Sequence, residues 1–377
     1  MKVASFALMD LNTGSGRYAL GLANSLSKSV EVKLFTSKRN LKYIGKVNNN
    51  LKVDFTKFFR PMGSLGKKWL GFRNPINFLS LILLIKKIRD YNPDIIHIQN
   101  GYEWLFFGYP FLNKYPIVTT LHDPIPHTGE NTWLQRFVVG SASKNSDGII
   151  VHGHKLKNIF FDRCRYPLSR IFVAKLIYEI SEDIKVSNNY QKNTILFQGR
   201  IVRYKGLENL VAAVDLVLEK IKDLKVIVAG SGSLQPYFKQ EPNPEVYEII
   251  NQWVSKEKLN SIFSKAGVVV LPYNDATQSA IIPIAYNFGK PVITTDVGAL
   301  SEVVNHGKTG LLVPRKSRVK LAASIIKLLD DDSLRMEMGQ NGRRLLKEQL
   351  SWDNKLHIDN MLFIYNSVIK NKSEGLN

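Results

Sequence analysis

The sequence predicts an α/β protein with two domains, each built on a parallel sheet. Short apolar runs typical of buried strands alternate with segments whose apolar residues repeat every three to four positions, as on one face of a helix. The 377 residues are enough for two domains of ordinary size, and 44% of them are hydrophobic. A polar stretch without apolar periodicity, 181–193, separates the halves. We therefore expect an N-terminal domain over 1–180 and a C-terminal domain over 194–350.

The N-terminal half begins with a strand that runs into a glycine-rich turn. Gly14 and Gly16 lie in this turn, outside the carboxyl end of the strand, where ligands of parallel α/β folds bind. His122 stands just past the carboxyl end of a later strand, where it either faces a ligand or only caps the loop. Strands are expected at 2–8, 30–36, 51–55, 93–99, 116–122, 147–152 and 171–173, and helices around 20–26, 78–85 and 155–161.

The C-terminal half repeats this alternation. We expect strands at 194–197, 224–229, 246–250 and 267–271. Helices are expected from 207, over 255–263 and 279–289, twice within 317–348, and from about 353 to the end, with Asp353 in its cap. A turn at Gly230 and Gly232 follows the second of these strands.

A cationic loop joins the first strand of this half to its helix. Gly199 lets the chain turn sharply, and Arg200, Arg203 and Lys205 follow before the helix begins. Cations beside the free N–H groups of a helix start form a site for an anion such as a diphosphate. The alternative is that they are solvated loop charges. A second helix start, near Ser279 and Ala280, favours a nucleoside diphosphate over an isolated phosphate.

Composition indicates the charge of the binding partner and the cellular compartment of the protein. Lys and Arg number 52 against 32 acidic residues, a net charge of +20 that favours an acidic partner. No zinc-finger, RNP or helix-turn-helix pattern supports nucleic acid. One cysteine, no signal-peptide pattern and no apolar run long enough to cross a bilayer favour the cytoplasm. The histidines at 152 and 154 lack a third ligand at suitable spacing, so no metal site is expected.

Residues 58–73 alternate aromatic and basic side chains around three glycines. Trp and Phe suit a membrane interface, and Lys and Arg suit anionic headgroups. The segment therefore predicts either a contact with the inner face of the cell membrane or a loop with packing aromatics.

The chain resembles the retaining family 4 (group 1) glycosyltransferases. The resemblance rests on Gly199-Arg200 and Lys205-Gly206 at a helix start and on the segment from Asp296 to Pro314, and covers nearly the whole chain. It implies the GT-B fold, two Rossmann-like domains facing across a cleft, with the C-terminal helix, about 353–377, returning to the first domain. It implies that His122, Arg200 and Lys205 are catalytic. The implied donor-binding residues are Gly14, Gly16, Gly199, Arg200, Lys205, Gly230, Gly232, Asp275, Thr277, Gln278, Ser279 and Ala280.

One departure concerns sugar and ribose recognition. The family pattern has two glutamates eight residues apart, and here Ala276 and Ile284 stand at those positions. Neither side chain accepts a hydrogen bond from a sugar hydroxyl. Asp275, next to the first position, is the candidate substitute.

The resemblance implies metal-independent, retaining transfer of a sugar from a nucleoside diphosphate sugar to a hydroxyl acceptor. We expect a saccharide or lipid-linked saccharide of surface polysaccharide synthesis as the acceptor, and no cofactor. Two alternatives stay open: a nucleotide-sugar epimerase of related fold, and a catalytically inactive nucleotide-sugar-binding relative.

Overall fold

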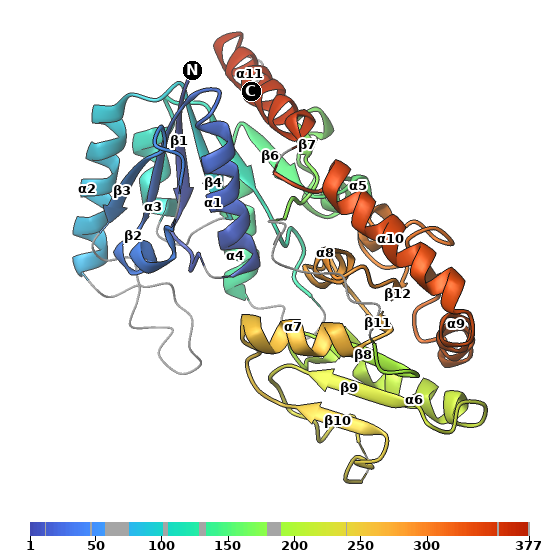
Figure 1. The fold of residues 1–377 in the computed structure, drawn as a ribbon. Helices are drawn as coiled ribbons and strands as arrows, with labels where there is room; N and C mark the ends of the chain where they lie inside the picture. Colours follow the sequence, from blue (N-terminus) through green and yellow to red (C-terminus); the bar gives the residue numbers. More distant parts are fainter. Residues whose placement is uncertain are drawn as a thin grey trace. The chain divides into compact units, whose positions relative to one another are not determined.

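The computed structural model describes residues 1–11, 13–45, 47–56, 75–100, 105–127, 133–178, 190–238, 240–352 and 354–375. The aromatic and basic segment 58–73, most of the predicted linker and Asp353 lie outside these ranges. The chain forms two compact units (Figure 1). Unit 1 comprises Met1–Pro126, Asn131–Glu179 and Trp352–Asn377, and unit 2 comprises His127–Glu130 and Ile180–Ser351.

Unit 1 contains a seven-stranded parallel sheet with the strand order β3-β2-β1-β4-β5-β6-β7. Its strands are β1 (Lys2–Ala7), β2 (Glu31–Ser37), β3 (Lys52–Thr56), β4 (Ile95–Gln99), β5 (Ile117–Thr120), β6 (Gly148–Val151) and β7 (Ile171–Val173). Its helices are α1 (Gly14–Leu26), α2 (Pro75–Tyr91), α3 (Leu105–Leu112), α4 (Trp133–Asn145), α5 (His154–Cys164) and α11 (Lys355–Ser373).

Both faces of this sheet are covered by helices, as the buried strands require. Successive side chains of a strand point to opposite faces. Along β1, Val3 and Ala7 pack with α1 and α11, whereas Ala4 and Phe6 pack with α2 and α3. Because both faces are buried there, the inner strands β1, β4, β5 and β6 are mostly apolar runs, the pattern that identified them in the sequence, whereas β2 and the edge strand β3 carry charged residues.

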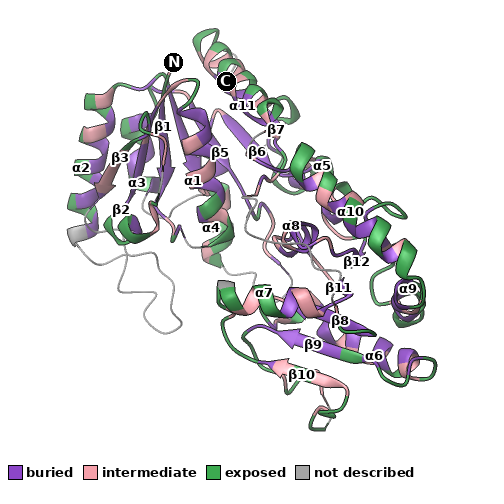
Figure 2. Ribbon diagram, viewed as in Figure 1, coloured by how far each residue is buried: buried purple, intermediate pink, exposed green. Residues whose placement is uncertain are grey.

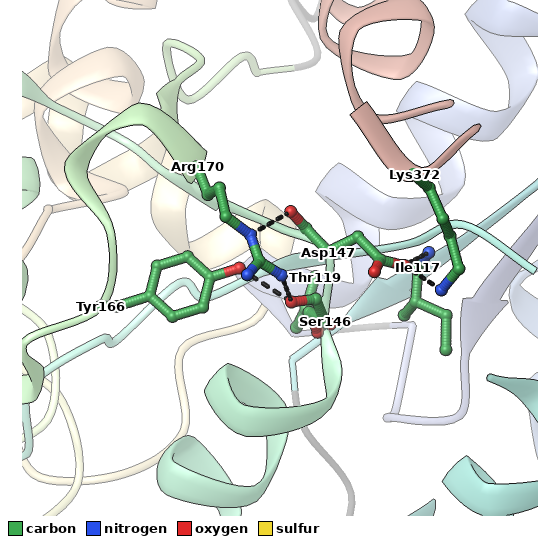
Figure 3. Close-up of polar contacts among 7 residues, drawn as sticks. All are labelled: Ile117, Thr119, Ser146, Asp147, Tyr166, Arg170 and Lys372. Carbon is green, nitrogen blue, oxygen red and sulfur yellow. Dashed lines mark hydrogen bonds and ion pairs between the residues drawn. The ribbon is translucent and has the colours of Figure 1, made fainter. Parts of the chain in front are cut away.

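Figure 3 shows how the C-terminal helix is fastened to unit 1. Asp147, just before β6, accepts hydrogen bonds from the backbone N–H of Ile117 and from Lys372 on α11, each at 2.8 Å. The Arg170 guanidinium donates to the backbone carbonyls of Asp147 (2.9 Å) and Ser146 (2.8 Å). An ion pair therefore joins residues 225 positions apart and adds to the apolar packing of α11.

Unit 2 contains a six-stranded parallel sheet with the order β10-β9-β8-β11-β12-β13. Its strands are β8 (Thr194–Gln198), β9 (Lys225–Ala229), β10 (Tyr247–Ile250), β11 (Val268–Leu271), β12 (Val292–Thr295) and β13 (Gly310–Val313). Its helices are α6 (Leu207–Leu218), α7 (Lys256–Lys265), α8 (Ile281–Asn287), α9 (Arg318–Asp330) and α10 (Asp332–Gln349). Helices α6 and α9 cover one face, and their buried side chains pack against β8, β9 and β11. The buried residues of each element are purple in Figure 2.

The strand orders locate the ligand positions of each unit. The sequence order reverses between β1 and β4 in unit 1, and between β8 and β11 in unit 2. Ligands of doubly wound sheets bind outside the carboxyl ends of the strands at such a reversal. The loops that follow β8 and β11, and those that follow β4, β5 and β6, are therefore where functional residues should gather.

The α/β prediction with two parallel sheets is confirmed, and every predicted strand occurs within two residues of its expected ends. The expected glycine-rich turn is wrong. Gly14 and Gly16 lie in the first turn of α1, because the Thr13 hydroxyl accepts a hydrogen bond from the Gly16 N–H (3.2 Å) and caps the helix there. A Cβ atom on Gly16 would lie 2.2 Å from the carbonyl oxygen of Asp10, so this close approach requires glycine.

Four elements were not predicted, and one cap differs. Helix α3 is apolar on nearly all sides and contains Pro110, so it lacks the helical period. Strands β12 and β13 have only four residues each. Helix α4 was also missed. The last helix is capped by Asn354, whose side chain accepts from the Leu356 N–H at 2.9 Å, and the predicted Asp353 lies outside the described residues.

Candidate functional site

The loops after β8 and β11 form one hydrogen-bonded structure in unit 2. A short 3₁₀ turn, Arg203–Lys205, lies in the first loop. The backbone carbonyl of Tyr204 in this turn accepts the N–H of Asn274, in the second loop, at 2.8 Å. Asn209 on α6 donates its side-chain amide to the carbonyl of Pro272 (3.0 Å) and to the side chain of Asn274 (2.9 Å). These bonds fix the cationic loop relative to the strand end.

Arg200 precedes Tyr204 in the sequence and Lys205 follows it, and both side chains contact this tyrosine. The Arg200 guanidinium donates to the Tyr204 hydroxyl at 3.0 Å. The Lys205 ammonium lies 5.6 Å from the centre of the Tyr204 ring and 4.0 Å from the centre of the Tyr273 ring. The structure therefore gathers the two predicted phosphate-binding cations around aromatic faces, which attract cations.

Lys205 is also held by a buried pair of hydroxyls. Its ammonium donates to the Tyr273 hydroxyl at 2.6 Å, and that hydroxyl lies 3.2 Å from the hydroxyl of Ser279. Burial raises the pKa of Tyr273, so the phenol stays neutral and keeps its proton. The contact links Lys205 to the predicted donor-binding segment 275–280.

His127 is a part of this site that the sequence did not indicate. It belongs to unit 2, and its ring stacks on Tyr204 with centroids 4.3 Å apart and an interplanar angle of 13°. Its Nδ1 lies 3.9 Å from a carboxylate oxygen of Asp275. Tyr204 is thus covered by an imidazole on one face. Tyr273 was missed as well, although its place at the end of β11 was a signal.

The remaining predicted residues of unit 2 surround this loop or support it. Gly230 and Gly232 follow β9, where a Cβ atom would lie 1.9 Å from the carbonyl oxygen of Gly199 and 2.1 Å from that of Ile201. They therefore allow the two loops to pack backbone to backbone. Ala276, Thr277 and Ser279 are buried, and Asp275, Gln278, Ala280 and Ile284 are half-buried.

In unit 1, four histidines lie buried: His97, His122, His152 and His357. The first three come from or follow the neighbouring strands β4, β5 and β6. His97 meets the ring of Tyr365, and the other three meet the ring of Tyr18, a residue of α1. The rings of His122 and His152 meet the Tyr18 ring edge-on, with centroids 5.2 and 5.0 Å away. A His122 ring nitrogen, Nδ1, lies 3.0 Å from Nε2 of His152. The backbone N–H of His122 is fixed by the Asn100 side chain at 3.1 Å.

Burial keeps these histidines neutral. It lowers the pKa of His152 to about 4 and the pKa values of His97 and His357 to about 3, because the charged imidazolium loses its hydration. The pKa of His122 is lowered well below its usual value for the same reason, with a smaller contribution from His152. Neutral imidazoles can accept and donate hydrogen bonds at neutral pH.

Within the ranges that the structure describes, no group of three or more His, Cys, Asp or Glu side chains is arranged to hold a metal ion. No described helix is long and apolar enough to cross a membrane.

Two family models match the chain. The model "Glycosyltransferase Family 4" matches residues 12–175, and "Glycosyl transferases group 1" matches residues 179–345. The chain is 29% identical over 163 residues to an uncharacterized glycosyltransferase of Methanocaldococcus jannaschii, spanning 42% of each protein. It is 29% identical over 188 residues to the capsular polysaccharide biosynthesis glycosyltransferase CapM of Staphylococcus aureus, spanning 48% of this chain and 47% of CapM. The chain thus spans about half the length of these relatives or less.

A solved structure of similar fold is Anabaena HepE in complex with UDP-glucose. Its TM-score is 0.69 at 15% identity, covering 99% of this chain and 100% of HepE. At this identity the likeness concerns the fold, and it agrees with the GT-B architecture that the resemblance implied.

The buried histidines predict that unit 1 loses stability in mild acid. Each ring is neutral when folded and takes up a proton near pH 6.5 when unfolded, so its contribution is complete above pH 6.5 and is lost as the pH falls towards 4. The free energy of unfolding should fall by up to about 1.4 kcal/mol per pH unit for each ring. Urea denaturation at pH 7.5 and 5.5 measures this.

Two variants provide the comparison for this pH dependence. His357→Gln should lower the number of protons taken up on unfolding by about one and so flatten the fall of the unfolding free energy with pH. His154→Gln, at an exposed position, should leave this fall unchanged. A free energy of unfolding that is equal at the two pH values would contradict the neutral cluster.

Proposed function

Because the chain belongs to the group 1 glycosyltransferases of family 4, we propose that it transfers a sugar from a nucleoside diphosphate sugar to a hydroxyl acceptor. The observation that carries the proposal is the position of Arg200 and Lys205, both fixed by hydrogen bonds to tyrosines outside the carboxyl ends of β8 and β11. Two fixed cations at the reversal of a doubly wound sheet suit a diphosphate. HepE, of similar fold, binds UDP-glucose.

The cations would act on the leaving diphosphate. As the bond between the anomeric carbon and the phosphate oxygen breaks, negative charge grows on that oxygen. Arg200 and Lys205 stabilise this charge more in the transition state than in the bound donor, which lowers the barrier. We propose that these two side chains fulfil the role that a divalent cation has in other enzymes, so that transfer needs no metal.

Retention of the anomeric configuration would follow from attack on the same face that the diphosphate leaves. The acceptor oxygen forms the new bond to the anomeric carbon, and its proton passes to the departing phosphate oxygen. His122 lies outside the carboxyl end of β5, and we propose that it contacts the transferred sugar. The predicted donor contacts of Gly14, Gly16 and the segment 275–280 belong to the same proposal.

The acceptor would be a lipid-linked saccharide of surface polysaccharide synthesis, met at the inner face of the membrane. The similarity to CapM supports the polysaccharide role. An apolar surface of unit 1 supports the membrane. Its large side chains lie on α2, α3 and α4 and are each between 42% and 63% exposed: Phe78, Leu79, Ile82, Leu83, Phe106, Phe107, Phe111 and Trp133.

This α2–α3–α4 surface is continuous and carries basic residues. Arg89 on α2 donates to the carbonyl of Phe111 on α3 at 3.1 Å, and Phe106 packs on Phe137 of α4 with ring centroids 5.4 Å apart. Lys86 on α2 and Arg136 on α4 are exposed as well. Apolar groups flanked by cations complement a bilayer with anionic headgroups. We propose that such a bilayer covers the α2–α3–α4 surface.

An inactive nucleotide-sugar-binding protein is the second candidate, and one observation favours it. Ala276 and the half-buried Ile284 occupy the positions of the two family glutamates, and neither can bind a sugar hydroxyl. Such a protein would bind the donor without turnover. An epimerase would convert the donor with no acceptor present. Following a labelled donor sugar with and without acceptor separates all three.

Removing a phosphate-loop cation should slow turnover. Lys205→Ala and Arg200→Ala should each lower kcat by about 10²–10³, because each removes a donor whose interaction strengthens as the diphosphate leaves. Tyr273→Phe keeps Lys205 but removes the hydroxyl that holds it, so its loss should be smaller. Initial rates at saturating donor give these values.

Lys222→Ala is the control for these variants, since Lys222 is an exposed lysine of the same unit. If the Lys205 and Arg200 variants stay within threefold of the Lys222 variant, the loop is ordinary surface.

The apolar surface should bind anionic vesicles. Leu79→Glu together with Leu83→Glu should weaken binding at least tenfold, because two apolar groups are lost and two like charges face the headgroups. Leu356→Glu, at an exposed position on α11, serves as the control and should change binding little. Vesicle sedimentation at low and high salt measures both effects, and equal binding of the two variants would overturn the membrane contact.

A further inference from the structure

The contact between His122 and His152 defines where each ring carries its proton. Nδ1 of His152 lies 2.8 Å from the backbone carbonyl of Ala174, which can only accept, so this nitrogen carries a hydrogen. The ring is neutral, and its Nε2 is therefore a bare acceptor. The Nδ1 of His122, 3.0 Å from that acceptor, must donate to it. Two rings and one carbonyl thus form a chain of hydrogen bonds in a single direction.

This series of hydrogen bonds leaves Nε2 of His122 without a proton. A neutral imidazole has one N–H, and His122 uses it towards His152. Its Nε2 is buried, and no residue in the described part of the chain donates to it. A buried acceptor without a donor is unfavourable, so the site favours a ligand that supplies a hydrogen. A sugar hydroxyl does so, whereas a carbonyl or carboxylate oxygen would meet a lone pair.

Neighbouring groups hold the orientation of the His122 ring, so that it does not flip and swap the positions of Nδ1 and Nε2. Tyr18 packs edge-on against both imidazoles, at interplanar angles of 83° and 71°. Asn100 fixes the backbone N–H of His122. The ring planes are therefore set by packing, and the proton positions by the Ala174 carbonyl.

We propose that His152 is a positioning residue that holds His122 with its proton on Nδ1, so that Nε2 accepts a hydrogen bond from a hydroxyl of the transferred sugar. The inference rests on the proposed transfer reaction for its biological meaning. The proton positions themselves can be measured without any substrate, so the two can fail separately. His152 does not touch the sugar and acts only through His122.

Nitrogen-15 spectra of the full chain with labelled histidine test the proton positions. Comparison with His122→Gln assigns one of the seven histidines as His122. The parent should show a protonated Nδ1 and an unprotonated Nε2 on His122. His152→Leu should mix the two tautomers, and His152→Gln, whose side-chain oxygen can accept the same hydrogen bond, should restore one. A proton on Nε2 in the parent, or an unchanged tautomer in His152→Leu, overturns the inference.

Turnover tests whether His152 acts through His122. His152→Leu should lower kcat about tenfold with nucleoside diphosphate affinity unchanged, and His152→Gln should stay within about threefold of the parent. In a His122→Ala background, His152→Leu should have no further effect. Losses that multiply in the double variant would overturn the positioning role. If no donor is turned over by the parent, the proposed function fails, and the spectra alone decide the tautomer.

Discussion

Tyr204 is the residue on which the candidate site of unit 2 depends. Its hydroxyl accepts a hydrogen bond from the Arg200 guanidinium, and its backbone carbonyl accepts one from the N–H of Asn274. Its ring lies near the Lys205 ammonium and stacks with the ring of His127. One side chain thus contacts both cations of the loop. The Tyr204 and Tyr273 rings also lower the cost of keeping the half-buried Lys205 partly out of water. A diphosphate would complete this arrangement by neutralising the charges that the loop has already gathered.

Unit 1 differs from unit 2 in that the histidines at its strand ends are neutral and buried. Four buried histidines have lowered pKa values. Three of them contact Tyr18, and a hydrogen bond joins His122 and His152, which follow the adjacent strands β5 and β6. Neutral rings recognise hydroxyls rather than charges.

The sequence predicted the elements that continuous apolar runs define, and missed those that depend on packing. Most strands of both sheets have this pattern, although β12 and β13 were missed, whereas α3 is apolar on nearly all sides and has no period. Arg200 and Lys205 were predictable because strand, cations and helix are contiguous. His127 was not, because its contact with Tyr204 joins positions 77 apart in sequence. The pair of His122 and His152 had a readable signal: each follows the end of a strand, and β5 and β6 proved to be neighbours.

The central claim is that fixed side-chain cations, and no metal, carry the departure of the diphosphate. The most direct measurement is transfer from UDP-, GDP- and ADP-sugars labelled in the sugar, with EDTA present and saccharide acceptors added. The account predicts a labelled glycoside with the anomeric configuration of the donor, formed at the same rate with and without EDTA. Transfer that appears only when magnesium or manganese is restored would contradict it.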